Sequence, residues 1–361
     1  METTILCPTT TFRAMGCQID LWLEADETTA TAAFVSVENL FAKNERILSR
    51  FSPTSELSQL NGRSGQWVLV SDLLWEVLEE ALIWASATDG LFDPTCLNAL
   101  EAAGYGVSFE ALARVQAHGR FPSDHLLHGQ WSAVQLDPSR QAVRLPEGVR
   151  LDLGGIAKGF TAQQAVDYLS TLGPCLVNAG GDLVAGDAPA ELPGWPVGVA
   201  LPSEDLAEAT AVAADNALSL WLANAALATS GIDYRRWLVN GRAAHHLINP
   251  YTGLPAETDL ITATVWAAQA AEAEVRATNS AAFRPKRWLA LLAAAATPGR
   301  RPHRRRRRTT PDPHHEQFNY LIIRTPNPEG LFVNWQNPQG FLRYEPIKKE
   351  RGEFFFAALF D

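Results

Sequence analysis

Residues 151–160 have the sequence Leu-Asp-Leu-Gly-Gly-Ile-Ala-Lys-Gly-Phe, and this stretch is the strongest local indication of the fold. The apolar residues predict the end of a strand, the two glycines a tight turn, and the following pattern a helix over residues 157–172. Residues 175–178 then predict a buried strand ending in Ala-Gly-Gly-Asp. Helix amides and the Lys158 ammonium together suit a phosphate. An ordinary strand-to-helix turn with a solvent-exposed lysine explains the same residues, and the GxxxxGK[ST] pattern of a P-loop is absent.

Hairpin and helix patterns surround this stretch on both sides. Residues 13–23 predict a first strand, residues 29–48 and 71–88 predict helices, and Asn240-Gly241 predicts a hairpin turn. Further strands are expected at residues 131–136, 141–145, 150–153, 195–201, 207–213, 233–239, 243–248, 260–267, 319–324 and 331–335, with an alanine-rich helix at 268–296. Residues 218–227 suit a helix or a strand. The mixture predicts an α+β protein with mixed or antiparallel sheets and packed helices.

An arginine-rich segment divides the chain. Residues 297–316 contain Pro, Arg and His with almost no apolar residue, which predicts a flexible loop. We expect one domain at residues 1–296 before this loop. Strands and a tail at residues 317–361 follow it and can complete the same domain.

Composition limits the classes of protein that this chain can be. Of its 361 residues, 47% are hydrophobic and 19% charged, which indicates a sizeable core, and the net charge of −10 argues against a general nucleic-acid binder. Four scattered cysteines form no CxxC pair, so a disulfide scaffold or a zinc ribbon is not expected. We find neither a signal peptide nor an apolar run long enough to span a membrane. A cytoplasmic location is therefore expected, unless an exported leader is missing.

Residues 245–253, His-His-Leu-Ile-Asn-Pro-Tyr-Thr-Gly, place histidines at the end of a predicted strand. An imidazole there can act as a base near neutral pH, and it can equally be structural. Because adjacent strand residues point to opposite faces, His245 and His246 are not expected to share a metal ion.

Glu274 and Thr278 are four residues apart and share one face of the alanine-rich helix. A carboxylate and a hydroxyl, together with backbone carbonyls, make an oxygen-rich site suited to Mg²⁺. A solvated helix face explains the same pair. The string Asn-Ala-Gly-Gly-Asp at residues 178–182 either admits a ligand close to the backbone or forms an ordinary β-turn. Aromatic residues in 49–52 and 90–95 can stack on a flat heterocycle or fill the core.

In combination and in this order, seven strings resemble the FAD:protein FMN transferases, the ApbE-type flavin transferases. They are RAMGC, LSRFSPTSELSQLN, GLFDPT, LDLGGIAKGF, VNAGGD, ATSG and HHLINPYTG, and the resemblance runs from about Phe12 to Thr278. It implies an α+β fold with two subdomains around a flavin cleft. It also implies an enzyme that uses Mg²⁺, takes FAD as substrate, moves FMN onto a Ser or Thr hydroxyl of an acceptor protein and releases AMP.

The resemblance further implies roles for individual residues. His246 is the candidate for the base that takes the proton of the acceptor hydroxyl. The carbonyl of Gly155, with Glu274 and Thr278, would hold Mg²⁺. Contacts to FAD are expected from eight residues, of which Asp152 and Lys158 lie near its polar part: Met15, Phe51, Leu91, Phe92, Asp93, Asp152, Lys158 and Ile248.

The chain departs from the family pattern at three places. Glu274 stands where the family usually has Asp, and its extra methylene requires the metal or the backbone to shift. Asn249 replaces the Asp of the family's His-x-Ile-Asp-Pro string, and the residues after about Pro298 do not resemble the family. Two alternatives therefore stay open: an FAD pyrophosphatase that gives FMN and AMP, and a non-catalytic flavin-binding protein with an impaired metal site.

Overall fold

The computed structural model describes residues 7–112, 129–200, 217–239, 241–258 and 260–282, together with strands at 319–324, 331–337 and 340–341. Parts of five predictions fall outside these residues: the strand at 207–213, the helix after residue 282, the segment 297–316, the C-terminal tail and the full Asn240-Gly241 turn. Within the described ranges, no helix has the length and apolar character needed to cross a bilayer.

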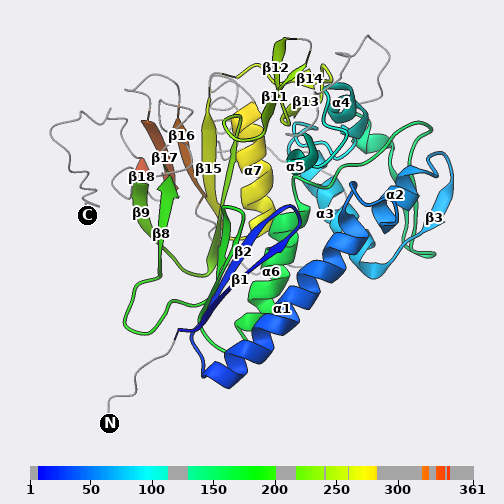
Figure 1. The fold of residues 1–361 in the computed structure, drawn as a ribbon. Coiled ribbons are helices and arrows are strands. Elements are labelled where there is room, and N and C mark those ends of the chain that lie inside the picture. Colours follow the sequence, from blue (N-terminus) through cyan, green and yellow to red (C-terminus); the bar gives the residue numbers. More distant parts are fainter. Residues whose placement is uncertain are drawn as a thin grey trace.

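A nine-stranded sheet is the centre of the fold (Figure 1). Its strand order is β1-β2-β6-β7-β10-β15-β16-β17-β18, and each neighbouring pair is antiparallel. The strands are β1 (Thr9–Ala14), β2 (Cys17–Leu23), β6 (Cys175–Ala179), β7 (Asp182–Ala185), β10 (Ala225–Gly231), β15 (Thr262–Ala267), β16 (Asn319–Arg324), β17 (Leu331–Asn337) and β18 (Gly340–Phe341). The prediction of an α+β protein with antiparallel sheet is confirmed.

The strand predicted at residues 13–23 is confirmed over β2, but its first two residues belong to a separate strand, β1. β1 and β2 form a hairpin in which Ala14 pairs with Cys17. Met15 and Gly16 make the turn with φ of 52° and 72°. Two consecutive residues in the left-handed region are typical of the tight turns that join antiparallel strands. The apolar–polar alternation that predicted a strand lies in the later part of this run, which is β2, and does not mark the turn before it.

Three helices cover one face of the large sheet: α1 (Glu27–Leu48), α6 (Ala157–Leu169) and α7 (Ala270–Ala282) (Figure 1). Their apolar faces share one core cluster with residues of β2, β6, β10 and β15. The α1 helix begins after Asp26, whose carboxylate accepts hydrogen bonds from two backbone N–H groups of the first turn. This packing fixes the start of α6 against the middle of α7.

A second core cluster forms beside these helices. It joins α2 (Glu56–Asn61), α3 (Asp72–Ala87) and a three-stranded sheet of β3 (Trp67–Leu69), β5 (Ala142–Arg144) and β4 (Gln135–Asp137) to the segment before α6. Ser71 caps α3 through its side chain, as its position in the sequence predicts. The expected hairpin around residues 137–140 is confirmed, although its first residues form a short 3-10 helix, η1 (Trp131–Ala133).

The segment at 150–153 is not a strand, which corrects the prediction. Leu151 and Leu153 are buried, and their apolar character suggested a strand. The backbone N–H of Asp152 instead bonds the carbonyl of Pro94, and Asn61 holds the backbone of Leu151. Side-chain and loop partners therefore satisfy this buried backbone in place of a neighbouring strand.

The remaining elements are short helices and hairpins. The helices are α4 (Leu97–Ala102) and α5 (Phe109–Leu112), and the paired strands are β8 (Trp195–Ala200) with β9 (Ala217–Leu222), β11 (Arg236–Val239) with β12 (Arg242–His245), and β13 (Ile248–Asn249) with β14 (Leu254–Pro255). The ambiguous residues 218–227 are strands, because they belong to β9 and β10, and Asn224 turns between them with φ of 47°.

Candidate active site

The turn before α6 begins the site. Oδ1 of Asp152 accepts a hydrogen bond of 2.6 Å from the backbone N–H of Gly154, and Oδ2 lies 2.8 Å from Nε of Arg50. A Cβ at Gly155 would stand 3.2 Å from a ring carbon of Phe92, so glycine lets this ring pack closely on the backbone. The turn therefore presents a carboxylate, a paired guanidinium and an aromatic ring beside the start of α6.

Lys158, in the first turn of α6, contacts two buried carboxylates. Its Nζ lies 2.5 Å from Oδ2 of Asp182 in β7 and 2.6 Å from Oε1 of Glu274 in α7. The side chains of Lys158, Asp182 and Glu274 are 15%, 9% and 4% exposed. Burial by itself lowers the pKa of a lysine, but the two carboxylates outweigh it and raise the pKa of Lys158. We call these three residues the Lys158 cluster, and its lysine stays an ammonium at physiological pH.

Glu274 also closes the N-terminal end of α6. Its Oε2 accepts a hydrogen bond of 2.9 Å from the backbone N–H of Gly159, where the helix favours negative charge. A Cβ at Gly159 would lie 2.8 Å from this oxygen and 3.1 Å from the carbonyl oxygen of Ala270, so the close approach requires glycine. Burial raises the pKa of Glu274; Lys158 opposes the rise and Asp182 adds to it. The longer side chain of glutamate thus has a defined use in this chain, which is to bridge α7 and α6.

Two hydroxyl groups, one from α7 and one from β10, meet near the Lys158 cluster. Thr278 is one turn beyond Glu274 on α7, and its Oγ1 lies 3.1 Å from Oγ of Ser230 in β10. The neighbouring N–H of Thr229 donates a hydrogen bond of 3.2 Å to Oδ1 of Asp182. The segment Ala-Thr-Ser-Gly therefore holds the second carboxylate and faces the hydroxyl of α7.

The donors at this site are oxygen atoms, which are the ligands that a hard divalent cation prefers. With all groups charged, the Lys158 cluster carries one excess buried negative charge, which a cation would balance. Both oxygens of Glu274 already accept hydrogen bonds, so an ion would share or displace those contacts. In the parts of the chain that the structure describes, no three His, Cys, Asp or Glu side chains gather as a metal site. The predicted ligand set has a single carboxylate, and its other donors are hydroxyl and carbonyl oxygens.

His246 follows β12, and its ring is held in the neutral form. Burial first, and then the charges of Arg235 and His245, lower the pKa of His246 to about 3. Its Nδ1 is buried and has no hydrogen-bond partner within the described ranges. In contrast, His245 has a ring nitrogen 3.0 Å from the carbonyl oxygen of Ala256 and serves the packing of the turn. The Nδ1 of His245 is also buried without a hydrogen-bond partner among the described residues, so the unpartnered nitrogen alone does not distinguish the two rings. His246 is the one that the family resemblance makes the candidate general base.

Three aromatic rings lie near Arg50, which is paired with Asp152 in the turn before α6. The guanidinium of Arg50 stacks 4.0 Å from the ring centroid of Phe51 and 4.7 Å from that of Tyr105, and Tyr105 lies 5.1 Å from Trp237. Phe51 is 43% exposed, whereas the side chain of Arg50 is 5% exposed. Phe51 thus offers surface to a planar ligand while Arg50 fixes it to Asp152.

Four other predicted FAD contacts lie in the walls around these groups. Met15 packs against both main core clusters, and Ile248 is buried among residues of α4 with Tyr105. Asp93 accepts hydrogen bonds from the N–H and the hydroxyl of Thr95, which gives it a structural use. Leu91 precedes the buried Phe92 in the same loop, and the nearby Asp89 carbonyl accepts a hydrogen bond from the hydroxyl of Tyr251, so this loop lies beside the segment that carries Ile248.

Asp182 and Arg50 are the residues that sequence reasoning did not assign to the site. In the sequence, Asp182 was considered only as the last residue of the Asn-Ala-Gly-Gly-Asp string, and Arg50 only as a member of the segment 49–52 with its aromatic residue. The available signal was an acidic residue after paired glycines and a basic residue beside an aromatic one. Neither pattern indicates which charged residue is the ion-pair partner of Asp182 or of Arg50.

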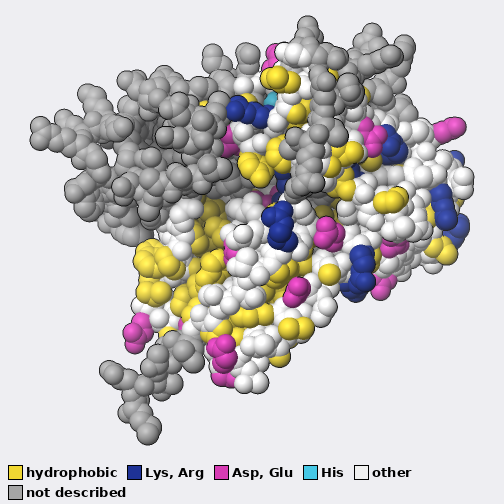
Figure 2. Space-filling view, in the orientation of Figure 1, with side chains coloured by type: hydrophobic (Ala, Val, Ile, Leu, Met, Phe, Trp, Pro, Cys, Tyr) yellow, Lys and Arg dark blue, Asp and Glu magenta, His cyan; other side chains and the backbone are white. Residues whose placement is uncertain are grey.

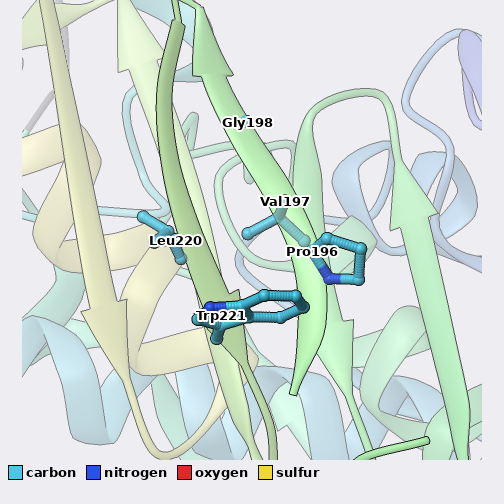
Figure 3. A pocket seen from close by; sticks show the side chains of 5 residues that line it. All are labelled: Pro196, Val197, Gly198, Leu220 and Trp221. Atoms are coloured by element: carbon cyan, nitrogen blue, oxygen red, sulfur yellow. The ribbon is translucent and has the colours of Figure 1, made fainter. Parts of the chain in front are cut away.

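A separate hollow of about 300 Å³ lies on the β8–β9 hairpin. Figure 3 shows its lining: Pro196, Val197, Gly198, Leu220 and Trp221. Figure 2 shows apolar side chains gathered on the left of the molecule, where Figure 1 places β8 and β9. None of the five lining residues is charged, so this hollow offers nothing to a phosphate or a metal ion.

Comparison with known proteins identifies the family of this chain. The ApbE family model matches residues 15–299. A Treponema pallidum protein named FAD:protein FMN transferase is 29% identical over 279 residues, covering 73% of this chain and 74% of its own. One of the same name from Chlamydia trachomatis is 29% identical over 235 residues, covering 61% and 65%.

Solved structures share the fold. The Thermotoga maritima ApbE protein superposes with a TM-score of 0.71 at 21% identity, covering 91% of this chain and 97% of its own. The Pseudomonas stutzeri flavinyl transferase ApbE gives 0.71 at 19% identity, covering 94% and 97%. Since the family model spans most of the residues that build the site, this chain belongs to the ApbE family.

Proposed function

We propose that this protein transfers FMN from FAD to a Ser or Thr hydroxyl of an acceptor protein in an Mg²⁺-dependent reaction that releases AMP. The observation that carries the proposal is the buried Lys158 cluster next to the hydroxyls of Thr278 and Ser230. This site combines an ammonium with oxygen donors for a cation, which is what cleavage of a pyrophosphate needs. Family membership and the names of the relatives support the same reaction.

In the proposed reaction, the acceptor oxygen forms a bond to the phosphorus of the FMN half. The bond from that phosphorus to the bridging oxygen breaks, and the bridging oxygen leaves with AMP. His246 takes the proton of the acceptor hydroxyl, because its imidazole is neutral and has a ring nitrogen without a partner among the described residues, although the low pKa makes this ring a weak base. No oxidant or reductant is consumed.

Other residues bind and orient the substrate. Phe51 would stack on a ring of FAD, with Arg50 and Asp152 holding it in place. Glu274, Thr278 and the carbonyl of Gly155 would hold Mg²⁺. When bound, Mg²⁺ neutralises charge that develops on the phosphates. Asp182 keeps Lys158 charged and positioned at the start of α6.

The test uses the purified full chain with FAD, Mg²⁺ and an acceptor protein that carries the target Ser or Thr. We expect equimolar AMP and an acceptor that fluoresces after denaturation, and we expect both to disappear with excess EDTA and return with Mg²⁺. AMP and FMN without acceptor would identify an FAD pyrophosphatase instead. FAD binding with neither product at any Mg²⁺ concentration would identify a non-catalytic flavin-binding protein and overturn the proposal.

A further inference from the structure

Among the described cations near the site, Arg235 differs from Lys158 and Arg50 in that it forms no ion pair with a described carboxylate. Lys158 already contacts Asp182 and Glu274 at hydrogen-bond distance, so its charge is largely balanced by the protein. Arg50 is paired with Asp152. Within the described ranges, no carboxylate forms an ion pair with Arg235. We propose that Arg235 contacts the substrate and binds the pyrophosphate of the dinucleotide, an inference that rests on the proposed function.

The position of Arg235 follows from the β11–β12 hairpin. Arg236 pairs with His245 in the register of the two strands, so Arg235 stands at the end of the hairpin next to His246. The ring of His246 is hydrogen-bonded to the backbone of Arg235. The two arginines have different surroundings: Arg236, the first residue of β11, is exposed, whereas Arg235, just before the strand, is partly buried.

A second neighbour places Arg235 near the Lys158 cluster. Cys17, in β2, has a pKa raised by burial, and the charges that act on it next are those of Lys158, Asp182, Arg235 and Glu274. One half-buried thiol is thus close to both Arg235 and the cluster. Arg235 therefore lies beside the proposed base, and Ser230, five residues before it, contacts Thr278 of the proposed cation site.

The chemistry of the guanidinium suits this place. An arginine presents a planar set of donors that fits phosphate oxygens in a bidentate manner, and it remains charged at any pH that the protein tolerates. Breaking the bridging P–O bond of FAD moves electron density onto the oxygen that leaves with AMP. Arg235 stabilises that charge without giving up a proton, whereas His246 deals with the proton of the acceptor.

The experiment compares Arg235→Gln with Arg236→Gln in the full chain, because the two remove the same charge from adjacent residues. The probes are FAD and riboflavin, which share the flavin ring but differ in the phosphates. Hydrogen bonds to a charged group contribute roughly 1.5–3 kcal/mol. We therefore expect Arg235→Gln to weaken FAD binding by about tenfold to a hundredfold, with riboflavin affinity unchanged. Arg236→Gln should change neither affinity, and Arg235→Lys should recover part of the loss.

An unchanged FAD affinity in Arg235→Gln would overturn the inference, and so would an equal loss for FAD and riboflavin, which indicates a structural effect. If Arg235→Gln does not fold, Arg235→Lys is used in its place, because it retains the charge. An equal loss of affinity for FAD and for riboflavin in Arg235→Lys would again refute phosphate binding. These affinities are read without turnover. Failure of the wild-type chain to release AMP would refute the proposed function, and the ratio of the two affinities would still test Arg235.

Discussion

Replacing Lys158 with Met tests the Lys158 cluster most directly. The variant keeps the length of the side chain but leaves Asp182 and Glu274 without their shared ammonium, and all three side chains are at most 15% exposed. Removing one partner of a buried ion pair destabilises a protein by roughly 3–5 kcal/mol, because an uncompensated charge remains. We expect a loss of this size in the free energy of unfolding at pH 8, measured by urea denaturation of the full chain without metal. Lys43→Met, at an exposed position of α1, is the control and should change stability by less than about 0.5 kcal/mol.

The pH dependence gives the sign of the effect. Burial raises the pKa of Glu274, so the folded variant binds a proton there more readily than the unfolded chain. Binding this proton stabilises the folded variant at low pH, and the stabilisation is lost as the pH rises through the folded-state pKa of Glu274. The loss of unfolding free energy in Lys158→Met should therefore be smaller at pH 5 than at pH 8. Adding Glu274→Gln should recover part of the loss at pH 8. A deficit below about 1 kcal/mol, or a double variant no more stable than Lys158→Met, would refute the reasoning.

Three further perturbations follow from the same geometry. Gly159→Ala places a Cβ 2.8 Å from Oε2 of Glu274 and should cost about 1–3 kcal/mol in urea denaturation, whereas Gly106→Ala, with open space around it, should be nearly neutral; equal effects would contradict the close approach. Arg50→Ala unpairs a buried carboxylate and should destabilise the fold by about 3 kcal/mol and weaken FAD binding, and unchanged fluorescence titration would exclude it from the site. Because the pKa of His246 is about 3, the rate of acceptor labelling should show no acidic limb from this ring between pH 5 and 8; a limb near pH 6.5 that His246→Gln abolishes would contradict the neutral-base assignment.

Local patterns predicted most of the regular structure near the site. Ser71 marks the start of α3, the helix after Gly154-Gly155 is α6, and the predicted buried strand is β6. These predictions succeeded because caps, glycine turns and apolar periodicity act over a few residues. The start of the strand predicted at residues 13–23 was wrong, because Met15 adopts a left-handed turn conformation that its residue type does not reveal.

Partnerships between distant segments could not be predicted in the same way. The sequence suggested Lys158, Glu274 and Thr278 as site residues, but it did not show that Glu274 bonds Lys158 and the N–H of Gly159. Those bonds depend on how α6 packs against α7, and 116 positions separate the lysine from the glutamate. Asp182 was missed as the second partner for the same reason, since a carboxylate after two glycines also suits a simple turn.

The long separation between Lys158 and Glu274 also orders events during synthesis on the ribosome. The segment with the lysine and the Ala-Gly-Gly-Asp turn emerges first, and its ammonium has only Asp182 nearby. Glu274 and the Thr278 hydroxyl arrive with α7, so an incomplete chain has two of the three charged groups of the Lys158 cluster and no closed end on α6. A nascent protein of this kind acquires its reactive centre only after most of its length has left the exit tunnel.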